Sequence, residues 1–194
     1  IDGDSFRFQH PRYLILQQNY GRDSVEYTKQ FAGKMVECLV EKLSDLGYHL
    51  LIEGTLRTVE VPSKTSELLQ NKGYIVQLAL IATKPELSYL STVIRYEELY
   101  AINPEQARAT PKKHHDRIVE NLVQNTQLLE QTGLFERIQI YQRDRNCIFD
   151  SKEDTISAAT VLQEVLFGKW NQVEKEMLKV GQEKLKILQK RIDD

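Results

Sequence analysis

Residues 73–86 read GYIVQLALIATKPE and are the stretch that decides the fold class. The apolar, β-rich run from Tyr74 to Ala82 predicts a buried strand. The segment 83–86, Thr-Lys-Pro-Glu, follows at once and has the form of a helix-capping box with proline in the first turn, so we expect a helix from here towards Tyr100. A strand that leads directly into a helix indicates an α/β protein.

The rest of the chain repeats this alternation of short β-rich runs and amphipathic helices. One predicted helix begins at Ser24 and ends at Gly47, and Pro62 and the Thr110-Pro111 pair each begin another. The alternation predicts a mostly parallel sheet with helices on both faces. The remaining predicted elements are strands at 49–53, 137–142 and 146–149, a helix around Leu162 and a helix over 170–192.

Length and composition favour one globular domain over residues 1–194, because the chain is 41% hydrophobic and 28% charged. A net charge of -2 provides no overall positive field to attract nucleic acid or an anionic membrane. Cys38 and Cys147 lie far apart without metal-ligand spacing, so we expect neither a disulfide framework nor a zinc site. We therefore expect a cytoplasmic protein that binds neither nucleic acid nor a membrane.

Asp2 and Asp4 flank Gly3 in a segment with the character of a strand exit. Open α/β sheets bind their ligands at the carboxyl ends of strands. A carboxylate at Asp4 can accept the proton of a substrate hydroxyl as that oxygen attacks phosphorus. The alternative interpretation is an aspartate that caps a turn or helix.

Glu53, Thr55 and Arg57 follow the strand predicted at 49–53 and bring a carboxylate, a hydroxyl and a guanidinium group to a second strand end. Such a group can bind magnesium or phosphate oxygens. The alternative is an acidic residue that is only solvated or structural.

Arg95 and Arg108 lie on either side of the helix-breaking Asn103-Pro104. Arginines delivered by a closing lid can neutralise charge on a moving phosphate, although exposed arginines paired with nearby glutamates are the alternative. Glu37 lies between apolar residues of the first predicted helix and needs either a ligand or a water-exposed helix edge. We expect His114-His115 to lie on a helix surface and to bind no metal.

The sequence contains no phosphate-binding loop of the form Gly-x-x-x-x-Gly-Lys-Ser/Thr. Gly33-Lys34 and Gly168-Lys169 both lack the earlier glycine and the hydroxyl residue after the lysine. We therefore expect no Walker-type lysine or ATP cradle within these residues.

Six motifs together resemble the zeta toxin family in their order and spacing, and they cover nearly the whole chain. The resemblance implies a P-loop-kinase-like fold and a kinase that uses ATP and Mg²⁺ to phosphorylate the sugar 3'-hydroxyl of UDP-N-acetylglucosamine. It also implies an epsilon-type antitoxin as protein partner. The motifs are Ile1-Asp-Gly-Asp-Ser-Phe-Arg, Gln9-His-Pro, Leu51-Ile-Glu-Gly-Thr, Arg57-Thr, Arg95-Tyr-Glu and Ala107-Arg-Ala-Thr-Pro-Lys.

The same resemblance implies roles for individual residues. Asp4 would be the catalytic base, and Arg95 and Arg108 would grip the ATP phosphates and assist transfer. Glu53 is a candidate metal ligand on its position alone. The residues expected to line the nucleotide-sugar site are Glu37, Thr55, Arg57 and Thr65.

By this resemblance, the family's first strand, phosphate loop and first helix would all precede Ile1. We therefore expect the single kinase domain over 1–194 to lack that unit and to be impaired or inactive as given. The alternative is a non-catalytic remnant that binds an antitoxin or a nucleotide sugar.

Overall fold

The computed structural model describes residues 1–104, 107 and 109–190. The chain packs as two compact units, which we call unit 1 and unit 2. The single domain predicted over 1–194 stays a prediction, since the packing within each unit does not test it. None of the described helices is both long and apolar enough to cross a membrane. Unit 1 comprises residues 1–55, 95–109 and 188–194, and unit 2 comprises residues 56–94 and 110–187.

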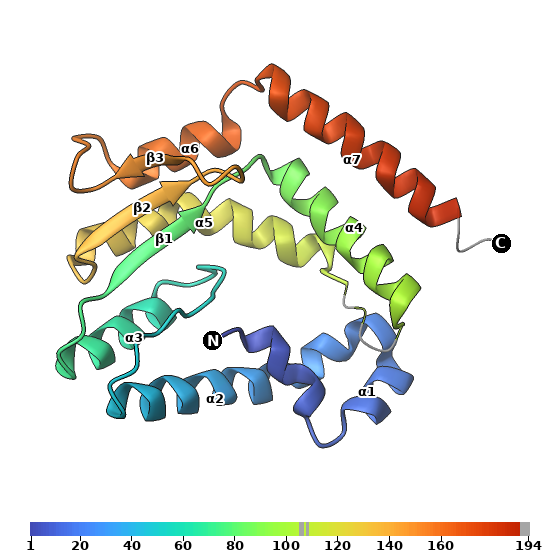
Figure 1. The fold of residues 1–194 in the computed structure, drawn as a ribbon, viewed down its shortest axis with the longest axis horizontal. Coiled ribbons are helices and arrows are strands. Elements are labelled where there is room, and N and C mark those ends of the chain that lie inside the picture. Colours follow the sequence, from blue (N-terminus) through green and yellow to red (C-terminus); the bar gives the residue numbers. More distant parts are fainter. Residues whose placement is uncertain (105–106, 108, 191–194) are drawn as a thin grey trace. The chain divides into compact units, whose positions relative to one another are not determined.

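Unit 2 is built on a three-stranded mixed sheet with the order β1–β2–β3 (Figure 1). β1 (Gln77–Ile81) pairs in parallel with β2 (Arg137–Tyr141), which pairs antiparallel with β3 (Cys147–Asp150). The strands confirm the β-rich runs predicted at 74–82, 137–142 and 146–149. Across the sheet, the register aligns the buried side chains of Leu80, Ile140 and Phe149 in one row.

The core of unit 2 lies where α6 (Ala158–Phe167) packs on β2 and β3, and α5 (Lys112–Thr132) packs on α6. Burying a large apolar side chain contributes about 1.5–3 kcal/mol, so this cluster is a main source of stability for the sheet. Its buried members are Leu80, Ala82, Ile138, Ile140, Phe149, Ala158, Leu162 and Leu166.

Local sequence signals set the helix ends of unit 2. α5 ends at Gly133, whose φ of 67° is the left-handed conformation that favours glycine. α6 begins after Ser157, whose side chain accepts a hydrogen bond from the Thr160 amide. α7 (Gln172–Lys190) begins with a reciprocal capping box between Asn171 and Glu174, with two hydrogen bonds of 2.8 Å.

The two helices on either side of β1 in the chain confirm the helices predicted from Pro62 and from the segment 83–86. α3 (Glu60–Asn71) contains Pro62 in its first turn, and α4 (Pro85–Ile102) begins directly after the segment 82–84. Along α4, residues up to Ile94 belong to unit 2 and residues from Arg95 onward belong to unit 1.

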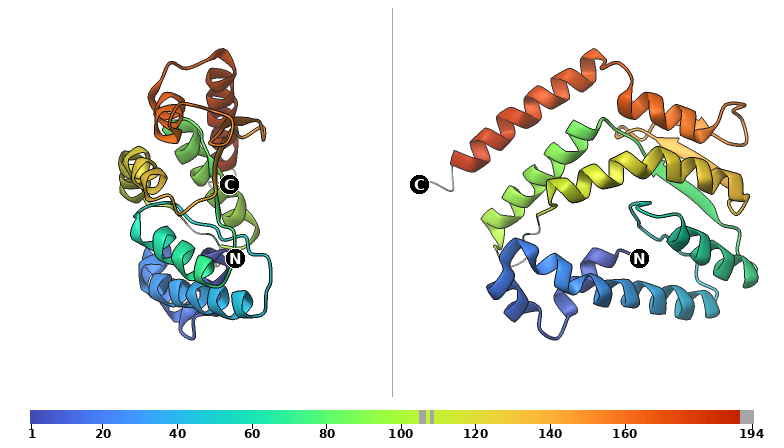
Figure 2. Two further views of the ribbon diagram at one scale, coloured as in Figure 1. Left: turned by 90° about the vertical axis from the view of Figure 1, so that its left-hand side faces the viewer. Right: turned by 180° about the vertical axis from the view of Figure 1, so that it is seen from behind.

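Unit 1 is helical. α2 (Ser24–Asp45) confirms the helix predicted from Ser24, and the 3-10 helix η1 (Gly3–Gln9) lies against it (Figure 2). In the chain, η1 and α2 are separated by α1 (Tyr13–Tyr20) and the short 3-10 helix η2 (Gly21–Asp23), neither of which was predicted. The reason is that α1 exposes apolar side chains such as Leu14 and Ile15, so it lacks the amphipathic period that marks a helix in sequence.

The strand predicted at 49–53 is wrong. The structure assigns no strand to this segment, which instead bonds to the first residue: the Ile1 amino group donates to the Leu51 carbonyl at 2.5 Å, and the Glu53 amide donates to the Ile1 carbonyl at 3.0 Å. These two bonds have the alternating pattern of a parallel ladder.

Candidate active site

Asp2 and Asp4 take different roles in η1. The Asp2 side chain accepts a hydrogen bond from the Asp4 amide at 2.9 Å, and the Asp2 carbonyl accepts one from the Ser5 hydroxyl at 2.7 Å. Asp2 is therefore the N-cap of η1, which is the structural interpretation that the sequence left open. Asp4 lies in the first turn with an exposed side chain.

Arg7 attaches Asp4 to α2. Its Nε donates to Asp4 Oδ1 at 2.7 Å, while its Nη1 donates to the Val25 carbonyl at 2.7 Å and to Thr28 Oγ1 at 3.1 Å. Thr28 is completely buried, and the Arg7 side chain is mostly buried. The planar guanidinium group thus fixes the direction of the carboxylate relative to α2. Sequence reasoning assigned no role to Arg7, because these contacts join residues about 20 positions apart.

A close approach between η1 and α2 brings Asp4 and Glu37 into one region. A Cβ at Gly3 would lie 3.2 Å from Val36 Cγ2, so the glycine permits the two elements to meet. Asp4 follows Gly3, and Glu37 follows Val36 on α2. Glu37 is exposed, which agrees with a helix edge in water and leaves its carboxylate accessible.

The bridge at Ile1 adds a third carboxylate to this part of unit 1. The Glu53 amide donates to the carbonyl of Ile1, which precedes Asp4 by three residues in the chain, and Thr55 follows Glu53 with an exposed side chain. Among the described residues, no three His, Cys, Asp or Glu side chains are grouped as a metal site. A metal role for Glu53 stays a prediction.

Arg95 belongs to the part of α4 within unit 1 and is exposed, whereas the next two residues, Tyr96 and Glu97, are buried. Arg95 forms no ion pair with a described residue, and Glu105, one possible partner in the paired-arginine alternative, lies outside the described residues. Arg108, the other predicted phosphate-binding arginine, lies outside the described residues.

Arg57 and Thr65 belong to unit 2. Arg57 is exposed in the loop before α3, and Thr65 is half-buried on α3 itself. The loop is held by Asn125 of α5, whose Nδ2 donates to the Leu56 carbonyl at 2.8 Å, and Leu56 adopts a positive φ of 49°. A non-glycine residue in this conformation is uncommon, and sequence reasoning did not identify it.

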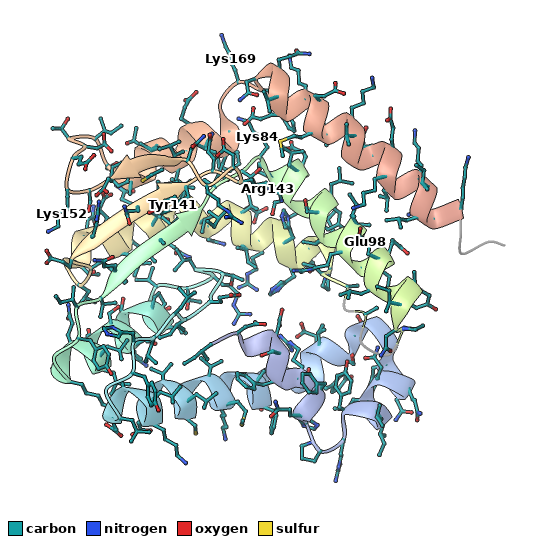
Figure 3. The ribbon with its side chains drawn as sticks, in the orientation of Figure 1. Lys84, Glu98, Tyr141, Arg143, Lys152 and Lys169 are labelled. Atoms are coloured by element: carbon teal, nitrogen blue, oxygen red, sulfur yellow. The ribbon has the colours of Figure 1, made fainter. Side chains whose placement is uncertain are left out.

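The carboxyl ends of β1 and β2 carry two cations that sequence reasoning missed, Lys84 and Arg143 (Figure 3). Lys84 is fully buried and donates to the Gly168 carbonyl at 2.8 Å, at the end of α6. Arg143 donates to Ser91 Oγ on α4 at 2.8 Å. Both cations have protein acceptors and therefore connect elements of unit 2.

His115 corrects the prediction that both adjacent histidines lie on a helix surface. It is buried, its ring centroid is 5.3 Å from that of Tyr89, and its Nδ1 lies 3.5 Å from Asp116 Oδ1. His114 is only half-buried. Adjacent residues of a helix point in different directions, so only one of the two histidines can face α4. The local sequence does not show which one does.

The described residues define a mixed α/β protein whose unit 1 carries exposed carboxylates, one of them on a 3-10 helix that Arg7 holds against α2. The zeta toxin family model matches residues 1–154, and the chain belongs to the zeta toxin family. Toxin PezT of Streptococcus pneumoniae is 76% identical over 188 residues, which cover 97% of this chain and 74% of that protein.

More distant relatives show the same family. Toxin zeta of Streptococcus pyogenes is 42% identical over 86% of this chain and 58% of its own length, and toxin zeta of Enterococcus hirae is 43% identical over 79% of this chain and 54% of its own length. A solved structure from the PezAT chromosomal toxin–antitoxin system of Streptococcus pneumoniae superposes with a TM-score of 0.87 at 73% identity. The superposition covers 97% of this chain and 74% of the chain in that structure. The predicted α/β class is confirmed.

Proposed function

We propose that this chain carries the substrate-binding and base-supplying part of a zeta-toxin-type kinase that phosphorylates the sugar 3'-hydroxyl of UDP-N-acetylglucosamine. The observation that carries the proposal is the exposed Asp4 carboxylate, which Arg7 holds against α2 at 2.7 Å. Its partner protein would be an antitoxin, as the PezAT system named for the pneumococcal relative suggests. The site of action would be the cytoplasm.

In the proposed reaction, Asp4 accepts the proton of the 3'-hydroxyl while the sugar oxygen bonds to the γ-phosphorus of ATP. The bond between that phosphorus and the bridging oxygen breaks, and ADP leaves with the electron pair. Arg7 keeps Asp4 in position, because a base must lie within hydrogen-bond reach of the proton it removes. Arg95 and Arg108 would neutralise phosphate charge.

Four further residues would bind the nucleotide sugar. Exposed Glu37, Thr55 and Arg57, with half-buried Thr65, offer carboxylate, hydroxyl and guanidinium groups suited to sugar hydroxyls and a diphosphate. Mg²⁺ bound to ATP takes most of its ligands from phosphates and water and needs only one or two carboxylates, so the single exposed carboxylate of Glu53 fits it. When bound, the ion would neutralise phosphate charge.

The test combines binding with turnover. The purified chain is mixed with ATP, Mg²⁺ and UDP-N-acetylglucosamine, and mass spectrometry follows the sugar nucleotide for an added phosphate. Because these residues contain no phosphate-binding loop, we expect at most slow product formation from the unaltered chain, and at least about a hundredfold less from Asp4→Asn, the usual loss when a general base is removed. Lys29→Gln, a change on the exposed part of α2, is the matched control.

Calorimetry with UDP-N-acetylglucosamine alone separates the two steps. Sugar-nucleotide binding without product would favour the non-catalytic alternative. If the chain neither binds UDP-N-acetylglucosamine nor forms product, the substrate assignment is contradicted. Product formation that survives Asp4→Asn would contradict the role of Asp4 while leaving the kinase assignment intact.

A further inference from the structure

The loop before α3 contains a leucine in an uncommon backbone conformation. Leu56 has a φ of 49°, which lies in the left-handed region, where the Cβ of an L-residue crowds the following carbonyl oxygen. A residue of this kind stays in that region only when its surroundings hold it, and such residues are frequent at binding and catalytic sites. The conformation of Leu56 is therefore imposed by contacts elsewhere in unit 2.

Two contacts within unit 2 hold Leu56. Its side chain is half-buried and packs against the hydrophobic core beside the sheet. Its carbonyl accepts a hydrogen bond of 2.8 Å from Asn125 Nδ2 on α5, 69 residues later in the chain. Asn125 is half-buried and directly precedes Thr126, which is fully buried, so α5 is well anchored at this point. Both the side chain and the backbone of Leu56 are thus attached to the packed part of unit 2.

Arg57 takes its backbone position from Leu56. The Leu56 carbonyl and the Arg57 amide belong to one planar peptide unit, so the hydrogen bond from Asn125 also fixes the plane from which Arg57 starts. The Arg57 side chain is exposed and forms neither a hydrogen bond nor an ion pair with a described residue. A guanidinium group that starts from a fixed backbone and whose donors are available is suited to bind a diphosphate.

The bond from Asn125 prepares the loop for a ligand. A loop that already has its bound conformation binds more tightly, because less conformational freedom is lost on binding. Without this bond, Leu56 can relax to the broad region of negative φ, and Arg57 would then start from many backbone positions. Binding would have to order the loop, and the affinity would fall.

We infer that Asn125 is a positioning residue that raises the affinity of unit 2 for a diphosphate by holding Leu56 and, through it, Arg57. The inference rests on the proposed function for the role of Arg57 and for the ligand, the diphosphate of UDP-N-acetylglucosamine. It adds to that function a residue of α5 that contacts the loop and not the ligand.

A double-mutant cycle on the full chain tests this inference, with calorimetric titration of UDP-N-acetylglucosamine as the measurement. Arg57→Ala should weaken binding at least about tenfold, as expected when a charge-assisted hydrogen bond is lost. Asn125→Leu keeps a similar volume without a donor and should weaken binding about fivefold or more. In the Arg57→Ala background, the same Asn125 change should alter affinity less than about twofold, because Asn125 acts only through Arg57.

Asn121→Leu is the matched control. Asn121 lies one turn before Asn125 on α5, but its Nδ2 donates to the Arg117 carbonyl of the same helix at 2.7 Å. This substitution should change affinity less than about twofold. The backbone NMR shifts of Leu56 should move in Asn125→Leu and stay in place in the control. If circular dichroism shows that Asn125→Leu does not fold, Asn125→Ala takes its place in the cycle.

Three outcomes with UDP-N-acetylglucosamine overturn the inference and leave the substrate assignment standing. The first is an affinity that Asn125→Leu does not change, and the second is an affinity that Arg57→Ala does not change. The third is an equal loss from Asn125→Leu with and without Arg57, since a purely structural role would lower affinity in both backgrounds.

Inorganic pyrophosphate separates the inference from the proposed function if the unaltered chain does not bind UDP-N-acetylglucosamine. Pyrophosphate binding that needs both Arg57 and Asn125 would support the inference and contradict the substrate assignment. Any other result with pyrophosphate would overturn both. None of these measurements uses kinase turnover, so failure of the proposed reaction is seen separately.

Discussion

Replacing Arg7 by alanine should release η1 from α2. Arg7 donates one hydrogen bond to the Val25 carbonyl, one to Thr28 Oγ1 and one to Asp4. A hydrogen bond from a charged group contributes about 1.5–3 kcal/mol, and an exposed ion pair contributes about 1 kcal/mol at most. The Thr28 hydroxyl still donates to the Ser24 carbonyl at 3.2 Å after Arg7 is removed, so Thr28 loses only one of its hydrogen bonds. We therefore expect the contact to weaken by about 2 kcal/mol.

Hydrogen exchange of the η1 amides measures this loss locally. The His10 amide, which donates to the Arg7 carbonyl at 3.1 Å, reports on the end of η1. A decrease of about 2 kcal/mol in the opening free energy corresponds to exchange about 30 times faster. Arg7→Lys keeps the charge but not the planar fork and should give an intermediate rate.

Arg12→Ala is the matched control, because Arg12 is an exposed arginine of the same unit whose side chain makes no such contact with the described residues. Its exchange rates at η1 should stay within about threefold of those of the unaltered chain. If Arg7→Ala behaved like Arg12→Ala, the guanidinium contacts would contribute little, and the reasoning that Arg7 positions Asp4 would fail.

Two further predictions concern unit 2. A Cβ at Gly168 would lie 2.4 Å from the Glu164 carbonyl oxygen, so Gly168→Ala should lower the free energy of unfolding by about 1–3 kcal/mol. Gly54→Ala, in unit 1, places a Cβ with no atom of a described residue within 4 Å beyond its chain neighbours and should leave the stability unchanged; thermal melts compare the two variants. The hydrogen bond from Arg137 lowers the pKa of Asp150 to about 2. Its stabilising contribution is complete above the unfolded-state value of about 3.9 and disappears as the pH falls towards 2. Asp150→Asn should therefore flatten the fall in stability between about pH 4 and 2 in urea titrations, and an unchanged slope would assign that fall to other groups.

The sequence predicted unit 2 well because its signals are local. Proline at the first turn of α3 and α4 and glycine after α5 mark helix ends through backbone conformation alone. Apolar runs mark β1 and β2 because both contribute to the buried core. Such signals need no knowledge of which residues meet in space.

Unit 1 depends instead on contacts between distant segments. The run at 49–53 has strand character, but its hydrogen bonds go to Ile1, which is about 50 residues earlier in the chain, and a local pattern cannot show them. The distinction between Asp2 as a cap and Asp4 as an exposed carboxylate likewise depends on η1, which no periodic pattern marks. Glu37 and Arg95 could be predicted as exposed, but their surroundings could not.

The exposure of the three carboxylates indicates what the fold contributes to the candidate site. Asp4, Glu37 and Glu53 all face water, so they can remain charged without the large cost of burying an unpaired charge. The fold therefore has to orient these carboxylates more than it has to bury them. Arg7 orients Asp4 by bonding to both Asp4 and the buried Thr28. A change at Arg7 should for this reason affect a reaction at Asp4 even though Arg7 itself donates its hydrogen bonds to the protein and accepts no proton.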